Sequence, residues 1–302
     1  MTSGPQYSPS WQAHPVKGRA AHSSGQVSKT KERDVDGKSW GLKVKASVSR
    51  GAAVAVLAVV AALPGAVPAQ AVGFDQVKRM GQEAFSLYMA HRRGELTDEQ
   101  LYAAVRQFVD IVGEAEDAII SHMDAVASAQ WVGAAQHAIL EVPSLPDLTE
   151  DNAEEFALEI SLYARQAKAT FDELSSEAVA DRLGFAIASL YAVALEARVW
   201  GNLNTSTTFM PNYKAAMKAI ADRLEPRCTG PREGDMDYHP SIYHQVYECV
   251  TPNGIVTLQD YQVDGVWREG PYTPETLKAT AGASSSWAIA KDVLRRMENE
   301  GI

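Results

Sequence analysis

The chain has 302 residues, of which 46% are hydrophobic; these values allow one or two globular domains and exclude a wholly disordered chain. Its two cysteines exclude a disulfide-dense miniprotein and a four-cysteine zinc site. With 38 Asp and Glu against 28 Lys and Arg, the formal net charge is −10, which argues against nucleic-acid binding because phosphates attract cationic surfaces.

Residues 1–46 are expected to be a disordered or untranslated N-terminal extension. Most of this segment, residues 1–42, is rich in Ser, Gly, Lys and His and has almost no apolar periodicity. A signal peptide normally begins with its charged region. We therefore expect translation to start downstream, near Val44 or Val48.

Residues 47–71 have the pattern of a signal peptide. Basic residues precede an apolar run at 51–63, and Ala69 and Ala71 form an A-x-A cleavage site. The run is shorter than the ~20 residues that a helix needs to span the hydrocarbon core, which disfavours a retained anchor. We expect cleavage after Ala71, a secreted protein, and contact with a membrane only during export.

Cleavage at this position would leave a strongly acidic protein. Residues 72–302 contain 19 Lys and Arg against 35 Asp and Glu, a formal net charge of −16. Such a surface is soluble, repels anionic lipids and favours cations or basic partners. The Ala-, Val- and acid-rich composition resembles that of proteins exported by high-GC Gram-positive bacteria, although no family motif is recognised.

Residues 72–225 have the periodicity of amphipathic helices and are expected to form an antiparallel bundle. In the first helix, apolar residues recur at three- and four-residue spacing from Phe74 to Tyr88, and Gly94 ends it. The next stripe begins with a capping box at Thr97.

This second stripe continues to Leu140. An unbroken helix of this length would extend for ~60 Å, more than a compact domain needs. Gly113 and Gly133 are the candidate interruptions, and two prolines after Leu140 mark the first certain break.

Three more helices complete the expected bundle. Residues 149–174 are amphipathic, whereas the following helix is apolar on every face from 184 to 195 and therefore belongs at the centre. Alanine makes up 22 of residues 101–200, which lets helix axes approach closely. A polar loop at 201–210 then precedes a short helix that Pro226 stops.

The composition changes at residues 226–274, which are expected to form a disulfide-linked β-hairpin region. Strand-like segments at 242–250 and 255–263 are joined by an Asn-Gly turn at 253–254. A C-terminal helix is predicted within residues 275–302, with a weak point at Gly-Ala-Ser-Ser-Ser.

Cys228 and Cys249 are predicted to form a disulfide, because both follow the export signal and lie in the region without long helices. Closing this loop would stabilise the fold by ~3 kcal/mol. Two free buried thiols are the alternative. The predicted fold class is mainly α: an antiparallel bundle of long helices with a small disulfide-stapled β-hairpin subdomain near the C-terminus.

An acidic segment beside the first cysteine is the best candidate metal site. Alternate residues of an extended segment point to one side, so several ligands could converge there. Carboxylates suit Ca²⁺, and an added imidazole suits Zn²⁺ or Mn²⁺. No calcium-loop pattern is present, and a solvated acidic loop is the simpler interpretation, so no cofactor is expected. The candidate ligands are Glu233, Asp235, Asp237, His239 and His244.

Other residues give little indication of catalysis. The sequence contains no H-E-x-x-H, G-x-S-x-G, P-loop or G-x-G-x-x-G motif. His122 lies on the apolar stripe and His137 near its extension; both are interpreted as structural histidines that bond a carbonyl or carboxylate. The serines at 284–286 are interpreted as a polar helix break, not as nucleophiles.

A group of aromatic residues near the hairpin is the strongest indication of function. Aromatic side chains with polar tips are frequent at interaction surfaces, because they offer a large contact area with little loss of rotamer freedom. The alternative is that they pack the hairpin onto the helices. The group is Tyr238, Tyr243, Tyr247, Tyr261, Trp267 and Tyr272.

The leading hypothesis is a secreted, non-enzymatic bundle that binds a protein or carbohydrate through this aromatic hairpin. A secreted metal-dependent hydrolase, with its site between Glu233 and His244, is the first alternative. The second is a membrane-active protein that inserts the apolar helix at 184–195, although this stretch is too short to span a bilayer unaided.

Overall fold

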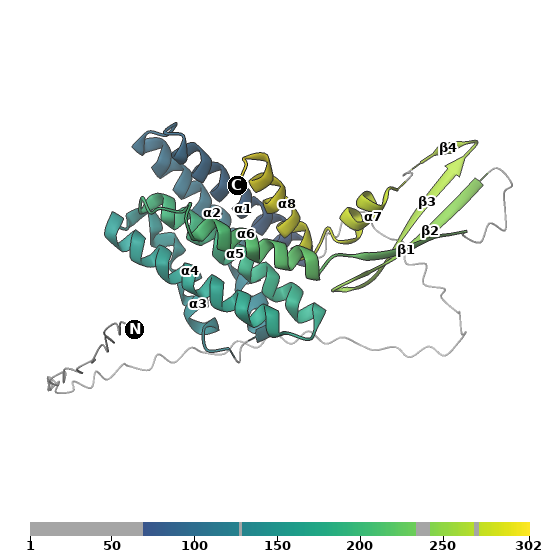
Figure 1. The fold of residues 1–302 in the computed structure, drawn as a ribbon, viewed down its shortest axis with the longest axis horizontal. Helices are drawn as coiled ribbons and strands as arrows, with labels where there is room; N and C mark the ends of the chain where they lie inside the picture. Colours follow the sequence, from purple (N-terminus) through teal and green to yellow (C-terminus); the bar gives the residue numbers. More distant parts are fainter. Residues whose placement is uncertain (1–68, 127–128, 234–241, 269–271) are drawn as a thin grey trace, which may run out of the picture. The chain divides into compact units, whose positions relative to one another are not determined.

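The structure is a computed structural model that describes residues 69–126, 129–233, 242–268 and 272–302, most of which are helical (Figure 1). The helices, with η marking 3₁₀ segments, are α1 (Ala69–Arg92), α2 (Asp98–Met123), η1 (Asp124–Val126), α3 (Val132–Leu140), η2 (Val142–Asp147), α4 (Glu150–Glu173), α5 (Glu177–Trp200), α6 (Phe209–Arg223), α7 (Pro274–Ala281) and α8 (Ser286–Asn299). The strands are β1 (Arg227–Glu233), β2 (Ile242–Thr251), β3 (Gly254–Val263) and β4 (Val266–Trp267). The predicted fold class is confirmed. Residues 1–68, with the expected extension and most of the expected signal peptide, lie outside the described part.

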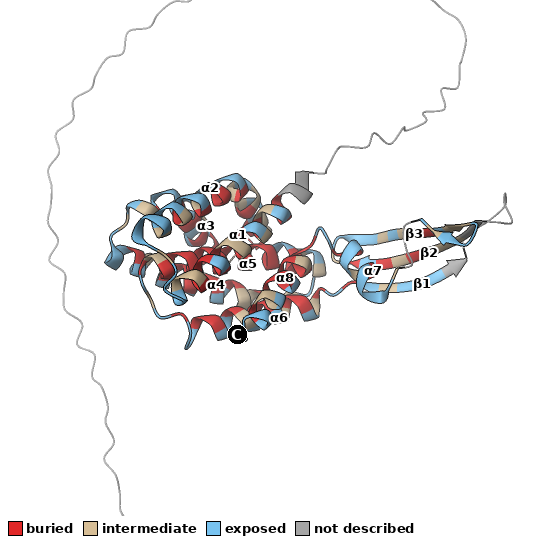
Figure 2. Ribbon diagram, turned by 90° about the horizontal axis from the view of Figure 1, so that it is seen from above, coloured by how far each residue is buried: buried red, intermediate tan, exposed pale blue. Residues whose placement is uncertain are grey.

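Helix α5 forms the centre of the bundle, as its apolar sequence predicts. Every residue from Leu183 to Val199 is buried, and α1, α2, α4, α6 and α8 all contact this helix (Figure 2). By length and composition α5 could cross a membrane, but 83% of its most apolar window is buried inside the protein. It therefore has the environment of a core helix.

The long apolar stripe after Thr97 forms two helices. The capping box is present as predicted, but α2 ends at Met123 and α3 starts only at Val132, so neither Gly113 nor Gly133 marks the break. The side chain of Gln136 donates to a carboxylate oxygen of Asp124 (2.8 Å) and so ties α3 to the end of α2.

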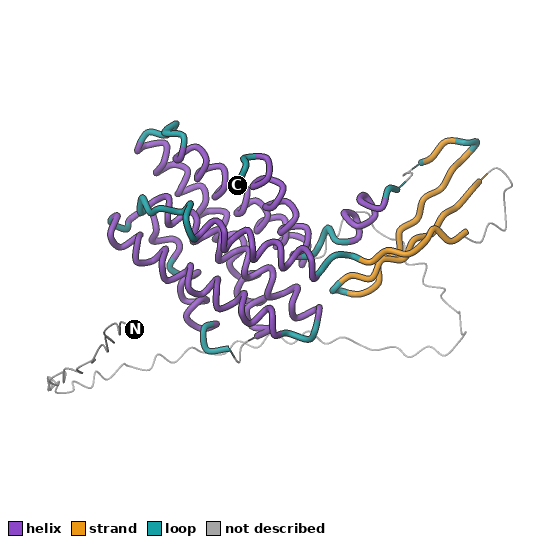
Figure 3. The backbone as a smooth tube through the Cα atoms, in the orientation of Figure 1, coloured by secondary structure: helices purple, strands orange, loops and turns teal. Residues whose placement is uncertain are grey.

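The C-terminal region contains a four-stranded antiparallel sheet of order β1-β2-β3-β4 (Figure 3). Strands β2 and β3 form the predicted hairpin. Strand β1 was not expected, because Arg227–Glu233 has no apolar alternation and its pairing with β2 is interrupted between Thr229 and Arg232.

The expected C-terminal helix divides at the predicted weak point into two helices with different surroundings. Helix α7 contacts β1, β2 and β3, whereas α8 packs against α1, α5 and α6. The hydroxyl of Ser285 donates to the carbonyl of Gly282 (2.7 Å) within the break. The last two elements therefore belong to the sheet and to the bundle, respectively.

Candidate binding surface

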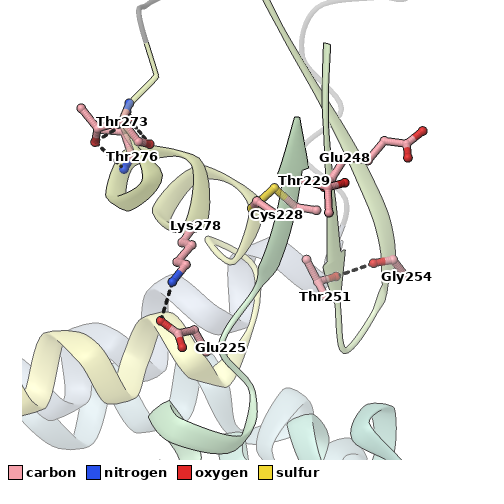
Figure 4. Close-up of a disulfide and its surroundings, with 10 residues drawn as sticks. Glu225, Cys228, Thr229, Glu248, Thr251, Gly254, Thr273, Thr276 and Lys278 are labelled. Atoms are coloured by element: carbon pink, nitrogen blue, oxygen red, sulfur yellow. Dashed lines mark hydrogen bonds and ion pairs between the residues drawn. A yellow bond between two sulfur atoms is a disulfide. The ribbon is translucent and has the colours of Figure 1, made fainter. Parts of the chain in front are cut away.

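The sheet has one face covered by α7 and one open face. Directly paired residues of antiparallel strands share a face, and neighbours along a strand alternate. Cys228 and Cys249 are register partners, and they form the predicted disulfide on the covered face (Figure 4). The bond therefore joins edge strand β1 to the hairpin strand β2.

The covered face is packed through aromatic and sulfur-containing side chains. Tyr247 is 5% exposed; its hydroxyl donates to the side-chain oxygen of Gln245 (2.8 Å), and its ring meets that of Tyr272 edge-on with centroids 5.9 Å apart. Leu277 of α7 and Cys249 are also buried. These contacts position α7 on the sheet.

The open face carries exposed apolar side chains at both ends of the paired strands β2 and β3. Val250 and Ile255 are register partners across β2 and β3, and their exposed fractions are 42% and 69%. Tyr261 (38%) and Val266 (60%) share this face by register, since Val266 pairs with Val263, two residues along β3 from Tyr261. Among the described residues, every exposed large hydrophobic side chain of the sheet lies here. The exposed apolar residues of the open face are therefore Val250, Ile255, Tyr261 and Val266.

Polar groups lie between these two apolar ends. The imidazole Nε2 of His244 lies 3.3 Å from the side-chain oxygen of Gln259, and the hydroxyl of Thr229 donates to the carbonyl of Glu248 (3.3 Å). A surface that combines apolar contacts with hydrogen-bonding groups is compatible with a protein–protein interface.

A buried carboxylate attaches the hairpin turn to the bundle. Asp181 of α5 is 2% exposed; it accepts hydrogen bonds from the amide and hydroxyl of Ser286 (both 2.8 Å) and from the side-chain nitrogen of Asn253 (2.9 Å). Burial raises the pKa of this carboxyl, and the hydrogen bonds offset part of the rise. The ammonium of Lys278 also pairs with Glu225 (2.9 Å) (Figure 4).

The structure distributes the predicted aromatic group over both faces. Tyr247 and Tyr272 pack together on the covered face, whereas Tyr261 lies on the open face. Trp267 is partly buried in β4, and Tyr243 lies in β2 as the register partner of Gln262. Tyr238 lies outside the described residues. Their role in binding stays a prediction.

The aliphatic residues of the open face were missed by sequence reasoning. The signal was present: apolar residues occupy both odd and even positions of the two strand segments, whereas a strand with one solvated face alternates.

Most of the predicted metal ligands, Asp235, Asp237 and His239, lie outside the described residues. Glu233 is the register partner of Gln245, and His244, next to Gln245 in β2, lies on the opposite face. The described parts of the chain contain no group of three or more His, Cys, Asp or Glu that could hold a metal. The metal site stays a prediction.

His122 has the contacts expected of a structural histidine, whereas no contact of that kind is seen for His137. His122 is half-buried; its Nδ1 lies 2.7 Å from the carbonyl of Ala118 on its own helix, and its ring stacks on Phe185 at 4.1 Å. Burial lowers the pKa of His122, so the neutral ring is favoured. His137 is exposed.

A cleft of about 670 Å³ lies between α1, α7 and α8. Trp287 lines it, together with cations such as Lys78 and Lys291 and anions such as Asp75 and Glu298. Because both signs of charge alternate around it, the cleft selects no single class of ligand. The open face is the better defined surface.

Comparison with known proteins finds no matching family model, no matching curated protein and no matching solved structure. Function is therefore argued from the chain's own geometry.

Proposed function

We propose that the protein is an exported, non-enzymatic binding protein whose open face contacts an extracellular protein partner. The observation that carries this proposal is that every exposed large hydrophobic side chain of the described sheet lies on one face; these are Val250, Ile255, Tyr261 and Val266. Exposed apolar groups that gather on one surface are typical of interaction sites.

A protein partner fits this surface better than a carbohydrate. Sugar binding relies on several aromatic rings, but Tyr247 is buried against Tyr272, and Tyr261 is the one aromatic residue on the open face as described. Branched aliphatic side chains such as Ile255 instead suit apolar contacts with another protein. The net charge of −16 over residues 72–302 favours a partner with basic residues around its apolar contact.

Export is supported by two independent features. The sequence at 47–71 has the charge, apolar run and A-x-A site of a signal peptide. Cys228 and Cys249 form a disulfide, a bond typical of proteins in oxidising compartments. Residues 72–302 would then constitute the secreted protein.

Photocrosslinking from the open face tests this function. A photoreactive residue replaces Thr257, which is exposed between Ile255 and Gln259, and the processed protein is illuminated with the extracellular proteins of its own host. We expect a crosslinked protein of basic charge, and about a tenfold lower yield when Ile255→Glu is added, because an apolar anchor is removed. The identity of the product comes from mass spectrometry.

Leu162→Glu is the matched control, since Leu162 is a 43% exposed aliphatic residue on α4, away from the sheet. It should leave the crosslinked product unchanged. A product that survives Ile255→Glu would overturn the open face as the binding surface. A product consisting only of a second copy of this chain would show that the open face mediates self-association and does not bind the proposed partner.

A further inference from the structure

A second candidate site lies at the surface of the bundle, in a cleft of about 170 Å³ between α4, α5 and the start of α6. Two arginines, a phenol, two hydroxyls and an amide line this cleft, and none of its eight lining residues is acidic. This is unusual in a chain with ten more acidic than basic residues. The polar lining residues are Ser161, Arg165, Tyr191, Arg198, Thr208 and Asn212.

Arg198 is held rigidly in this cleft. It is 7% exposed; its Nε donates to the hydroxyl of Ser161 (3.2 Å), its Nη1 donates to the carbonyl of Asn204 (3.2 Å), and its guanidinium lies over the ring of Phe209, 4.7 Å from the centroid. Its Nη2 has no hydrogen-bond acceptor among the described residues. The side chain therefore offers donors whose direction is already fixed.

The positive charge of this cleft is not neutralised by an ion pair within the described chain. Arg165 donates from its Nε to the carbonyl of Ser161 (3.3 Å), so both arginines are bound to neutral groups. Burial lowers the pKa of Arg198, and the nearby charge of Arg165 lowers it further, while Glu154 acts in the opposite direction. A buried cation without a counter-ion is costly, and a bound anion would remove that cost.

Helix α6 adds to the same electrostatic field. This helix of 15 residues begins at Phe209, it has no acidic residue in its first turn, and Thr208 provides no side-chain cap. The amino terminus of a helix carries partial positive charge, which favours anions. Both the arginine side chains and the backbone at the start of α6 thus favour a bound anion.

We propose that this cleft binds a small tetrahedral oxyanion, phosphate or sulfate. The two guanidinium groups, the hydroxyls of Tyr191 and Thr208 and the amide of Asn212 provide more donors than a single carboxylate can accept, whereas four oxygens around one centre can use them. The hydroxyl of Ser161 is not among these donors, because it donates to the carbonyl of Ala157 (2.6 Å). The cleft is large enough for such an ion and a few water molecules. This site is separate from the open face and does not depend on the proposed partner.

Calorimetric titration of the processed protein with inorganic phosphate, at constant ionic strength, tests the site. We expect a dissociation constant of about 1 mM or tighter, sulfate binding in the same range, and weaker binding of acetate. Arg165→Gln should weaken phosphate binding at least about tenfold, because one charge-assisted donor is lost. Arg165 is exposed, so the variant should keep its fold, which circular dichroism checks.

Arg106→Gln removes the same charge from an exposed arginine of α2 and should leave phosphate binding unchanged. Equal binding of glycerol 3-phosphate would place the ligand among phosphate esters, and binding of inorganic phosphate alone would place it among free oxyanions; either result supports the site. Absence of binding to both phosphate and sulfate, or equal loss in the two arginine variants, would overturn it.

Discussion

At the scale of single residues, Glu196 is the most unusual side chain of the core. It is fully buried in α5, and neither carboxylate oxygen has a hydrogen-bond partner in the described structure. Burial raises the pKa of Glu196 well above its usual value, and the negative charge of Glu83 raises it further. Glu196 directly follows the apolar run at 184–195, and acidic residues are too numerous in the chain for this one to stand out in the sequence.

This raised pKa predicts a pH-dependent effect of Glu196→Gln. The folded state binds the proton of Glu196 more tightly than the unfolded chain does. The stability that this proton provides is therefore complete below the ordinary carboxyl pKa of 4.5, and it is lost as the pH rises through the pKa of Glu196 in the folded state. The variant cannot ionise. As the pH rises through this window, the free energy of unfolding of the wild type should therefore fall by about 1.4 kcal/mol per pH unit relative to that of the variant.

Denaturant unfolding of both proteins at several pH values between 4 and 8 provides the measurement. Glu155→Gln, at an exposed position of α4, corrects for the loss of one negative charge. A difference in unfolding free energy that stays constant with pH would show that Glu196 is ionised in the folded protein.

At the scale of elements, the disulfide is expected to stabilise the sheet and not the bundle. Replacing both cysteines, with Cys228→Ser and Cys249→Ser, frees edge strand β1 from β2. Loss of ~3 kcal/mol of loop-closure stabilisation corresponds to about a hundredfold faster amide exchange in the sheet. Hydrogen exchange followed by mass spectrometry measures this rate in β2 and β3.

The amides of α5 are the internal reference for this experiment, because the core of the bundle has no part in the disulfide. Their exchange should not change in the double variant. Unaltered exchange in β2 and β3 would mean that α7 and the Asp181 hydrogen bonds already hold the sheet without the bond.

The elements that the sequence predicts well are those with strong local signals. Thr97 caps its helix as expected, and the Asn-Gly turn joins the two long strands. The break after Met123 was not predictable, because it depends on the packing of α3 back onto α2 through Gln136. Strand β1 likewise owes its existence to pairing with β2, not to its own composition.

At the scale of the whole molecule, the candidate sites depend on tertiary arrangement more than the helices do. The cleft that contains Arg165 and Arg198 joins residues from α4, α5 and the start of α6, and no spacing in the sequence connects Arg165 with Asn212. The open face is more local: Val250 pairs with Ile255 across the predicted hairpin turn, so the sequence itself holds the signal for this pair. Contacts between separate helices, such as those that form the cleft, cannot be obtained from periodicity alone.

We propose that the bundle acts outside the cell, with its sheet cross-linked by an oxidised cysteine pair. Intact-mass spectrometry after alkylation of the unreduced protein, on both medium and cytosol of the native host, measures location and oxidation state together. We expect an extracellular species with the mass of residues 72–302 and no alkylated cysteine. A full-length cytosolic protein with Cys228 and Cys249 both alkylated would contradict it.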